Sequence, residues 1–185
     1  FLRSLQLGLI VMVATIFVSV LTGLAFRKKF FGSTILFYTT VSSLIVPSIL
    51  VSLGIGLLYT LMECESAWYS SGMGAHLTWT LPFGFLIMIA VFNRFDRSYE
   101  EAAKDLGANN WQTIRYVVLP IITPSLIGVA LFGFTLSYDE FARTLMTSGV
   151  KNTLPLEIFG MTTNVTTPTL YALGTLTTVF SLVVI

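Results

Sequence analysis

The sequence is poor in the residues that most enzymes and metal proteins need. Its single cysteine, Cys64, cannot form a disulfide within the chain, and its single histidine, His76, has no partner set for metal ligation. It contains no G-x-x-x-x-G-K-[ST] phosphate loop for binding a nucleotide. A net charge of +1 argues against nucleic acid as a partner. These absences leave few routes to catalysis, metal binding or nucleic-acid binding.

Charged residues are also scarce, at 10% of the chain, whereas 55% of residues are hydrophobic and the mean hydropathy is +0.84. A membrane span needs about 20 apolar residues to cross roughly 30 Å of hydrocarbon. Five runs without Asp, Glu, Lys or Arg are long enough: Ser4–Phe26, Phe30–Met62, Ser66–Asn93, Tyr116–Tyr138 and Ile158–Ile185. The sequence therefore predicts an all-α, polytopic membrane protein with five transmembrane helices.

The run Phe30–Met62 is too short for two spans and a turn, which together need more than about 40 residues. We expect one long helix, tilted or broken, with a kink at Pro47 because proline removes a backbone donor. Gly54 and Gly56 then offer small surfaces where a neighbouring helix can approach closely.

This count of spans places most of the positive charge on one face of the membrane. Seven of the ten cations share the face of the loop at 94–119, and three lie on the other face. The seven are Arg27, Lys28, Lys29, Arg94, Arg97, Lys104 and Arg115; the three are Arg3, Arg143 and Lys151. Because short cytoplasmic loops are rich in Lys and Arg, we expect the loop at 94–119 to be cytoplasmic.

The loop at 94–119 has the signals of two short helices joined at a corner. Ser98 and Glu101 predict a capping box, and Gly107 suits a left-handed helix end. Asn109 then predicts a second cap, followed by a short helix over Trp111–Val118 that Pro120 limits. Such a rigid elbow is either a plain connector between membrane helices or a docking element for another protein.

The elbow also resembles a known motif. Glu101-Ala102-Ala103, then Gly107 after three intervening residues, and Leu119-Pro120 after a further eleven, are similar to the EAA loop of bacterial ABC-importer permeases of type I, the MetI-like class. Val117 departs from the isoleucine that the family prefers. The resemblance covers nearly the whole chain and implies that the residues listed next couple the permease to an ATPase: Glu101, Ala102, Ala103, Gly107, Leu119 and Pro120.

The resemblance implies a set of partners and a location. An ABC ATPase dimer in the cytoplasm would hold the elbow and carry the ATP and Mg²⁺, with no cofactor bound by this chain. A second permease subunit, expected to be a different but related chain, and a periplasmic solute-binding protein would complete the machine. The chain is then a non-enzymatic, multi-pass protein of the bacterial inner membrane that switches between inward-open and outward-open states. We interpret residues 1–185 as a single permease domain from a longer protein.

A second set of residues points to the solute. Ser137-Tyr138-Asp139-Glu140-Phe141, together with Thr153–Leu156 and Leu77–Phe85, resembles subunits of spermidine/putrescine importers. Carboxylates beside an aromatic ring suit the ammonium groups of a polyamine, so Tyr138, Asp139 and Glu140 are candidates for the solute path. Arg143 lies close enough in sequence to pair with either carboxylate, and both carboxylates can equally be solvated.

The sequence leaves other functions open. The same machine could import an opine, an amino acid such as γ-aminobutyrate, ferric iron or an oxyanion. A passive channel is a remote alternative, because it has no need of a docking elbow. An intramembrane enzyme is also remote, since it needs a convergent set such as two histidines with a carboxylate, or a serine with a base.

Overall fold

The computed structural model describes residues 1–164 and 168–184, and within these ranges every regular element is a helix. The elements are α1 (Leu2–Phe26), α2 (Ser33–Ser42), α3 (Ser48–Leu61), η1 (Trp68–Gly72), α4 (Met73–Arg94), α5 (Ser98–Asp105), α6 (Asn110–Thr113), η2 (Ile114–Val118), α7 (Leu119–Tyr138), α8 (Leu154–Asn164) and α9 (Pro168–Val184). η1 and η2 are single π-helical turns that continue directly into α4 and α7. The predicted all-α architecture is confirmed.

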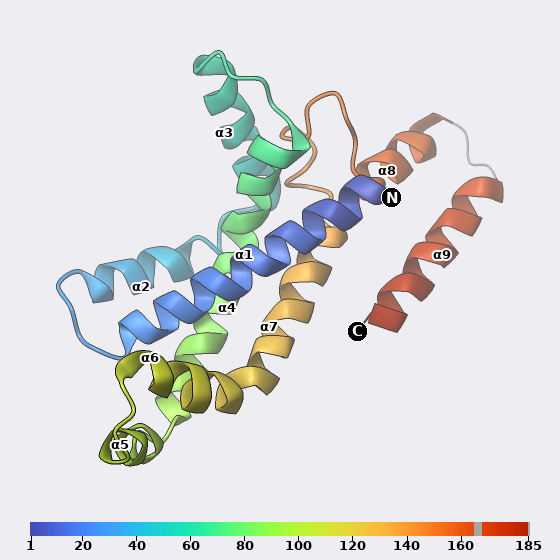
Figure 1. Cartoon of the computed structure of the whole chain (residues 1–185). Helices are drawn as coiled ribbons and strands as arrows, with labels where there is room; N and C mark the ends of the chain where they lie inside the picture. Colours follow the sequence, from blue (N-terminus) through green and yellow to red (C-terminus); the bar gives the residue numbers. More distant parts are fainter. Residues whose placement is uncertain (165–167, 185) are drawn as a thin grey trace.

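Three helical segments of the described chain are long and apolar enough to cross a membrane: Leu2–Phe26, Trp68–Arg94 and Asn110–Tyr138. They form the body of the molecule, with α1, α4 and α7 packed side by side (Figure 1). The two other predicted spans contain shorter apolar helices, Ser48–Leu61 and Pro168–Val183. The count of five spans therefore stays a prediction.

Small and hydroxyl-bearing residues bring the three long helices close together. Thr15 of α1 donates a hydrogen bond to Thr80 of α4, with 2.8 Å between the two hydroxyl oxygens. Gly84 packs so tightly against α1 that a Cβ there would lie 2.1 Å from the Ser19 hydroxyl oxygen. Lipid offers no hydrophobic drive to helix association, so close backbone approach and buried hydrogen bonds hold such bundles together.

The apolar run Phe30–Met62 is broken, as predicted, and the break is larger than a kink. α2 ends at Ser42 and α3 begins at Ser48, with Pro47 in an extended conformation directly before α3. The expectation for Gly54 and Gly56 needs correction. Gly56 is approached by the loop after α7, where the Met146 carbonyl would lie 2.8 Å from a Cβ, while Gly54 faces open space.

The contacts define two ends of the bundle. At the end that carries α5 and α6, called the inner end here, Arg27 meets Glu100. At the opposite, outer end, Arg3 donates a hydrogen bond to the Asn152 carbonyl, and Ser52 contacts Met146. The chain therefore passes from the inner to the outer end between Arg27 and Ser52, in agreement with a single broken pass.

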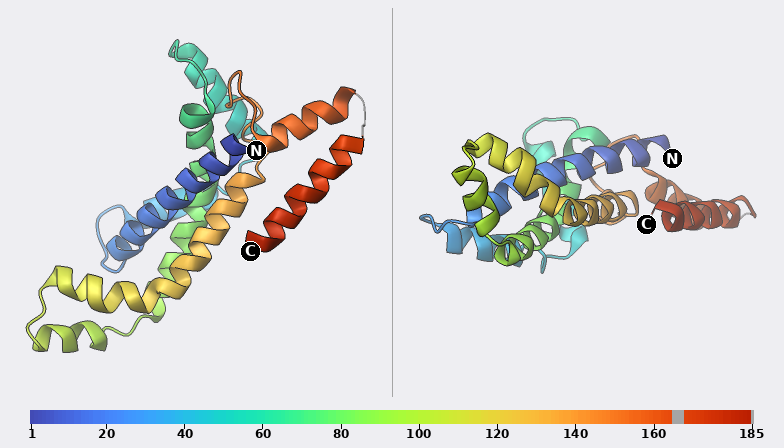
Figure 2. Two further views of the ribbon diagram at one scale, coloured as in Figure 1. Left: turned by 45° about the vertical axis from the view of Figure 1, so that its right-hand side comes forward. Right: turned by 60° about the horizontal axis from the view of Figure 1, so that its bottom comes forward.

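The last two helices lie beside the bundle. α8 leads away from its outer end and α9 returns alongside (Figure 2). Phe180 of α9 contacts Phe1 and Tyr138, with ring centroids 5.5 and 5.3 Å apart, which ties α9 to the outer ends of α1 and α7.

Candidate functional site

The elbow formed by α5 and α6 projects from the inner end of the bundle, outside the three long apolar helices (Figure 1). Gly107 turns the chain between the two helices in the left-handed conformation, with φ of +86°. Its N–H donates to the Lys104 carbonyl at 2.8 Å, and the Ala108 N–H donates to the Ala103 carbonyl at 3.0 Å. The predicted glycine corner is confirmed, and its hydrogen bonds satisfy carbonyl groups at the end of α5.

The predicted cap of the second elbow helix is also confirmed. The Asn109 side chain accepts the Gln112 N–H, and the Gln112 side chain accepts the Asn109 N–H, each at 2.9 Å. These reciprocal bonds form a capping box that fixes the start of α6.

The predicted capping box at Ser98 is wrong. Ser98 lies in the first turn of α5, Arg97 occupies the cap position, and no side chain caps it. Asp96 takes over instead, because its carboxylate accepts the Ser98 N–H at 2.9 Å. Hydrogen bonds from the backbone and hydroxyl of Ser98 lower the pKa of Asp96. Glu101 is thereby free of any capping role.

Pro120 does not end the second helix. Asn110–Tyr138 is one continuous helical segment, in which Leu119 and Pro120 belong to the first turn of α7. Proline has no N–H for the carbonyl four residues before it. The π-helical turn η2 precedes this gap, with the Leu119 N–H bonded to the Ile114 carbonyl. The elbow therefore continues directly into a membrane helix.

Glu100 anchors the elbow to the first membrane helix. Its two carboxylate oxygens accept hydrogen bonds from Nη1 and Nη2 of Arg27 at 2.6 and 3.0 Å. The Arg27 guanidinium lies 5.4 Å from the ring centroid of Phe92 and 5.3 Å from that of Phe95. The sequence placed Arg27 on the same face as the elbow but gave no signal of this pairing.

The elbow presents an exposed surface, and its carboxylate at Glu101 makes no ion pair within the described chain. Glu101, Ala102, Gly107 and Pro120 are exposed, while Ala103 and Leu119 are half-buried. Large apolar side chains accompany them: Leu106 is 90% exposed and Trp111 is 65% exposed. Apolar groups displayed beyond the membrane helices are typical of a contact surface for another protein. Leu106 and Trp111 were missed by motif matching, although their apolar character inside a polar loop was a usable signal.

At the outer end, residues 139–153 form a loop with several turns, here called the outer loop, which is hydrogen-bonded to several helices. The Met146 N–H donates to the Ser52 hydroxyl of α3 at 3.0 Å. The Ser71 hydroxyl of η1 donates to the Thr147 carbonyl at 2.7 Å. The N–H of Leu154, directly after the loop, donates to the Ser4 hydroxyl of α1 at 2.7 Å.

His76 is buried at the centre of this fastening. Its Nδ1 lies 2.8 Å from the Ser137 hydroxyl of α7, and its Nε2 lies 2.9 Å from the Thr144 hydroxyl of the outer loop. Within the described ranges, no three His, Cys, Asp or Glu residues gather where they could hold a metal ion. His76 thus joins α4, α7 and the outer loop through hydrogen bonds.

The three predicted solute-path residues have different surroundings. Tyr138 is buried and stacks on Phe134, with ring centroids 5.6 Å apart. Asp139 lies at the surface, where partial desolvation raises its pKa. The Glu140 carboxylate accepts the backbone N–H of Arg143 at 3.0 Å. The structure brings the two carboxylates to the outer loop but places the Tyr138 ring in an aromatic cluster.

The ion pair of Arg143 with a neighbouring carboxylate, one of the alternatives that the sequence left open, does not form. Arg27 and Glu100 make the one ion pair found among the described residues. The Arg143 guanidinium is instead buried against α4, where it donates to the Thr78 hydroxyl and lies 4.9 Å from the ring centroid of Trp79.

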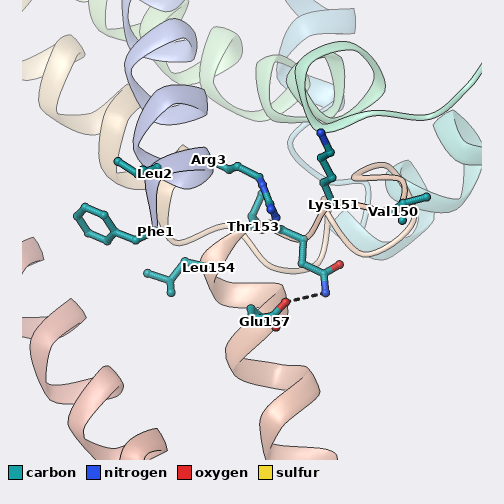
Figure 3. A pocket seen from close by; sticks show the side chains of 9 residues that line it. Phe1, Leu2, Arg3, Val150, Lys151, Thr153, Leu154 and Glu157 are labelled. Atoms are coloured by element: carbon teal, nitrogen blue, oxygen red, sulfur yellow. Dashed lines mark hydrogen bonds between the residues drawn. The ribbon is translucent and has the colours of Figure 1, made fainter.

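On the side away from α4, the outer loop borders an open groove of about 710 Å³ (Figure 3). Arg3, Lys151 and Glu157 contribute charged groups to its wall, and Asn152 donates to Glu157 at 2.9 Å. The outer loop therefore has one face on this polar groove and one face on α4.

Three apolar helices long enough to cross a membrane, with an elbow at one end and a hydrogen-bonded loop at the other, define a helical membrane protein. The chain belongs to the family of binding-protein-dependent transport system inner membrane components, which matches residues 7–185. It is therefore a multi-pass inner-membrane protein of a transport system and not an enzyme.

Curated relatives narrow the class. The chain is 32% identical over 161 residues to the spermidine/putrescine transport system permease protein PotC of Haemophilus influenzae, covering 86% of this chain and 61% of that protein. It is 32% identical over 164 residues to PotC of Escherichia coli, covering 86% and 59%. It is 30% identical over 154 residues to the putrescine transport system permease protein PotI of Escherichia coli, covering 80% and 55%. The chain thus spans about three-fifths of the length of these relatives.

Proposed function

We propose that this chain is the membrane-spanning part of a permease subunit of a binding-protein-dependent ABC importer, moving a polyamine inward by ATP-driven alternating access. The observation that carries the proposal is the anchored elbow, in which Glu100 pairs with Arg27 while Glu101 and Ala102 remain exposed. Likeness to the spermidine/putrescine and putrescine permeases supports the choice of cargo.

The elbow has the connections that mechanical coupling needs. Arg27 links it to α1, and the continuous segment Asn110–Tyr138 links it to α7. Glu101, Ala102 and Leu106 offer a charged, small and apolar surface to a cleft on an ATPase. Movement of two ATPase subunits toward one another would push the elbows and change the packing of α1, α4 and α7. Short, capped helices transmit such a displacement because they bend little.

The proposal assigns the remaining tasks to other chains. An ATPase dimer holds ATP and Mg²⁺ and supplies the hydrolysis, since this chain has no phosphate loop. A second permease, different but related, completes the membrane path, and a periplasmic binding protein delivers the solute. Annular lipid surrounds the apolar helices.

Asp139 and Glu140 support a cationic cargo. They lie in the outer loop at the end of α7, where a solute arrives from outside. Carboxylates attract the spaced ammonium groups of a polyamine through charge-assisted hydrogen bonds. Tyr138 acts with them only if its ring leaves the cluster that it forms with Phe134.

Uptake into proteoliposomes tests the proposal. The vesicles hold the full-length permease with its partner permease, its ATPase and its binding protein, and the measurement is ATP-dependent accumulation of radiolabelled putrescine and spermidine. We expect unlabelled polyamines to inhibit this uptake by competition. Amino acids, opines and ferric iron should leave it unchanged. ATP hydrolysis stimulated by the binding protein without polyamine uptake would retain the importer and reject the cargo. Uptake that needs no ATP would indicate a channel.

A further inference from the structure

Arg143 of the outer loop carries a buried guanidinium with only part of its hydrogen-bonding capacity used. The residue is fully buried, at 0% exposed. Nη1 donates to the Thr78 hydroxyl, and Cζ lies 4.9 Å from the ring centroid of Trp79. Nε and Nη2 are buried and have no hydrogen-bond partner within the described part of the chain. One neutral hydroxyl and one aromatic face therefore hold the cation.

The unused nitrogens form one edge of the guanidinium. Nε and Nη2 are neighbours, and together they bind a carboxylate through two parallel hydrogen bonds. Glu140 is close in sequence, but its carboxylate accepts the Arg143 backbone N–H and leaves this edge unoccupied. Leaving buried charged donors without partners is costly. A second arrangement, in which Asp139 or Glu140 takes this edge, would remove the cost.

The surface beneath Arg143 has the chemistry of a cation site. Trp79 offers an aromatic face, which attracts an ammonium or guanidinium group, and Thr78 offers a hydroxyl acceptor. The Trp79 ring is followed along α4 by Phe83, and Phe83 faces Phe132 of α7, with centroid separations of 5.1 and 5.8 Å. Aromatic faces thus extend from this position along the bundle.

We propose that Thr78 and Trp79 bind one ammonium group of a polyamine, and that Arg143 fills this site from within the chain while the outer loop is closed. An arriving ammonium group replaces the guanidinium, whose Nε–Nη2 edge then pairs with Asp139 or Glu140. Arg143 is thereby an internal competitor that lowers the apparent affinity of the site. The inference rests on the proposed function, because the cargo supplies the ammonium group.

Equilibrium binding of radiolabelled putrescine tests the proposal. The complex of full-length permease, partner permease and ATPase is placed in nanodiscs without ATP and without the binding protein, which would itself take up the probe. Arg143→Gln removes the tethered cation, and we expect its Kd for putrescine to fall by about 2-fold to 30-fold, the range of a cation–π contact. Arg143→Lys is the matched control, and we expect it to keep a Kd near that of the wild type. Trp79→Leu is expected to raise the Kd by a similar factor.

The outcomes separate the competitor from a purely structural arginine. Equal Kd values for the Gln variant and the wild type overturn the proposal, as does weaker binding in both Arg143 variants. If Arg143→Gln fails to assemble, Trp79→Leu still tests the site. An unchanged Kd for putrescine in Trp79→Leu would overturn it. A wild-type complex that hydrolyses ATP without importing polyamine retains the importer but rejects the polyamine cargo, and with it the ligand of this site. Polyamine import by the wild type with an unchanged Kd in Arg143→Gln contradicts only the role of Arg143.

Discussion

Arg27 and Glu100 form a bidentate ion pair that ties the first membrane helix to the elbow, with atom separations of 2.6 and 3.0 Å. Their side chains are only 15% and 18% exposed, so water screens the pair less than it screens surface ion pairs. Arg97 of the elbow also donates to the Arg27 carbonyl, at 3.1 Å. A force on the elbow therefore reaches α1 directly, in addition to α4 and α7, which continue from its two ends.

Glu100→Gln should uncouple ATP hydrolysis from transport. The amide cannot form the charged bidentate pair, and we expect the elbow to lose on the order of 1 kcal/mol of anchoring free energy. The measurement is the number of putrescine molecules imported per ATP hydrolysed in proteoliposomes, which should fall while the ATPase still copurifies.

Glu101→Gln is the matched control, because the neighbouring carboxylate is exposed and makes no ion pair in the described chain. We expect this variant to weaken ATPase copurification and to leave the import ratio of the assembled complex close to that of the wild type. A wild-type import ratio in Glu100→Gln would show that the Arg27–Glu100 pair plays no part in coupling.

Gly107→Ala and Gly107→Pro should impair transport to different degrees. Alanine at φ of +86° costs about 1–2 kcal/mol in the left-handed region, and proline can neither adopt this angle nor supply the N–H that Lys104 accepts. We expect partial uptake for the alanine variant and none for the proline variant, with normal membrane insertion by protease protection. Full ATP-driven uptake by Gly107→Pro would contradict the role of the corner in docking.

The parts of the fold that the sequence predicted are those that local chemistry decides. Gly107 and the Asn109–Gln112 box are fixed by conformational preference and short-range hydrogen bonds, so the pattern identified both. The long apolar helices follow from hydropathy. The predicted cap at Ser98 failed because Asp96, two residues earlier, can also accept a backbone N–H at the start of α5. In the structure Asp96 accepts the Ser98 N–H. The prediction that Pro120 limits the second helix failed because the π-helical turn before it lets the helix continue although proline has no N–H to donate.

The parts that were missed depend on contacts between distant residues. Arg27 meets Glu100 across 73 positions, and His76 meets Ser137 across 61. No periodicity or spacing encodes such pairs in a single sequence. The sequence left open whether Arg143 pairs with a neighbouring carboxylate, and in the structure its guanidinium packs against Trp79 instead. The candidate site was therefore predictable at the elbow and only partly predictable at the outer loop.

The start of α5 offers a direct comparison between two residues. Asp96→Ala removes the acceptor of the Ser98 N–H, so we expect fraying of α5, faster amide exchange at Ser98 and Tyr99, and lower uptake. Ser98→Ala keeps the N–H and should leave helix fraying, amide exchange and uptake near those of the wild type. Hydrogen exchange on the assembled complex provides the measurement, and stronger fraying in Ser98→Ala would restore Ser98 as the cap.

Asp139→Asn should raise the thermal stability of the protein at pH 7 while it lowers transport. Desolvation raises the pKa of Asp139 in the folded protein, so the folded state favours its neutral form and loses stability as pH rises through that pKa. Asparagine removes this loss, and we expect a higher Tm than wild type at pH 7. The difference should shrink as pH falls below the ordinary pKa of an aspartate, about 4, because the carboxyl is then protonated in both the folded and the unfolded state.

Putrescine uptake at pH 7 should fall in the same variant if Asp139 attracts the solute. Asp139→Glu retains the charge and is expected to keep more uptake than Asp139→Asn, although its own desolvation leaves the Tm close to that of the wild type. A complex with a raised Tm and undiminished uptake would place Asp139 outside the solute path. A Tm difference that persists well below pH 4, where the aspartic acid is neutral, would contradict the electrostatic origin of the gain, since a neutral aspartic acid and asparagine carry the same charge.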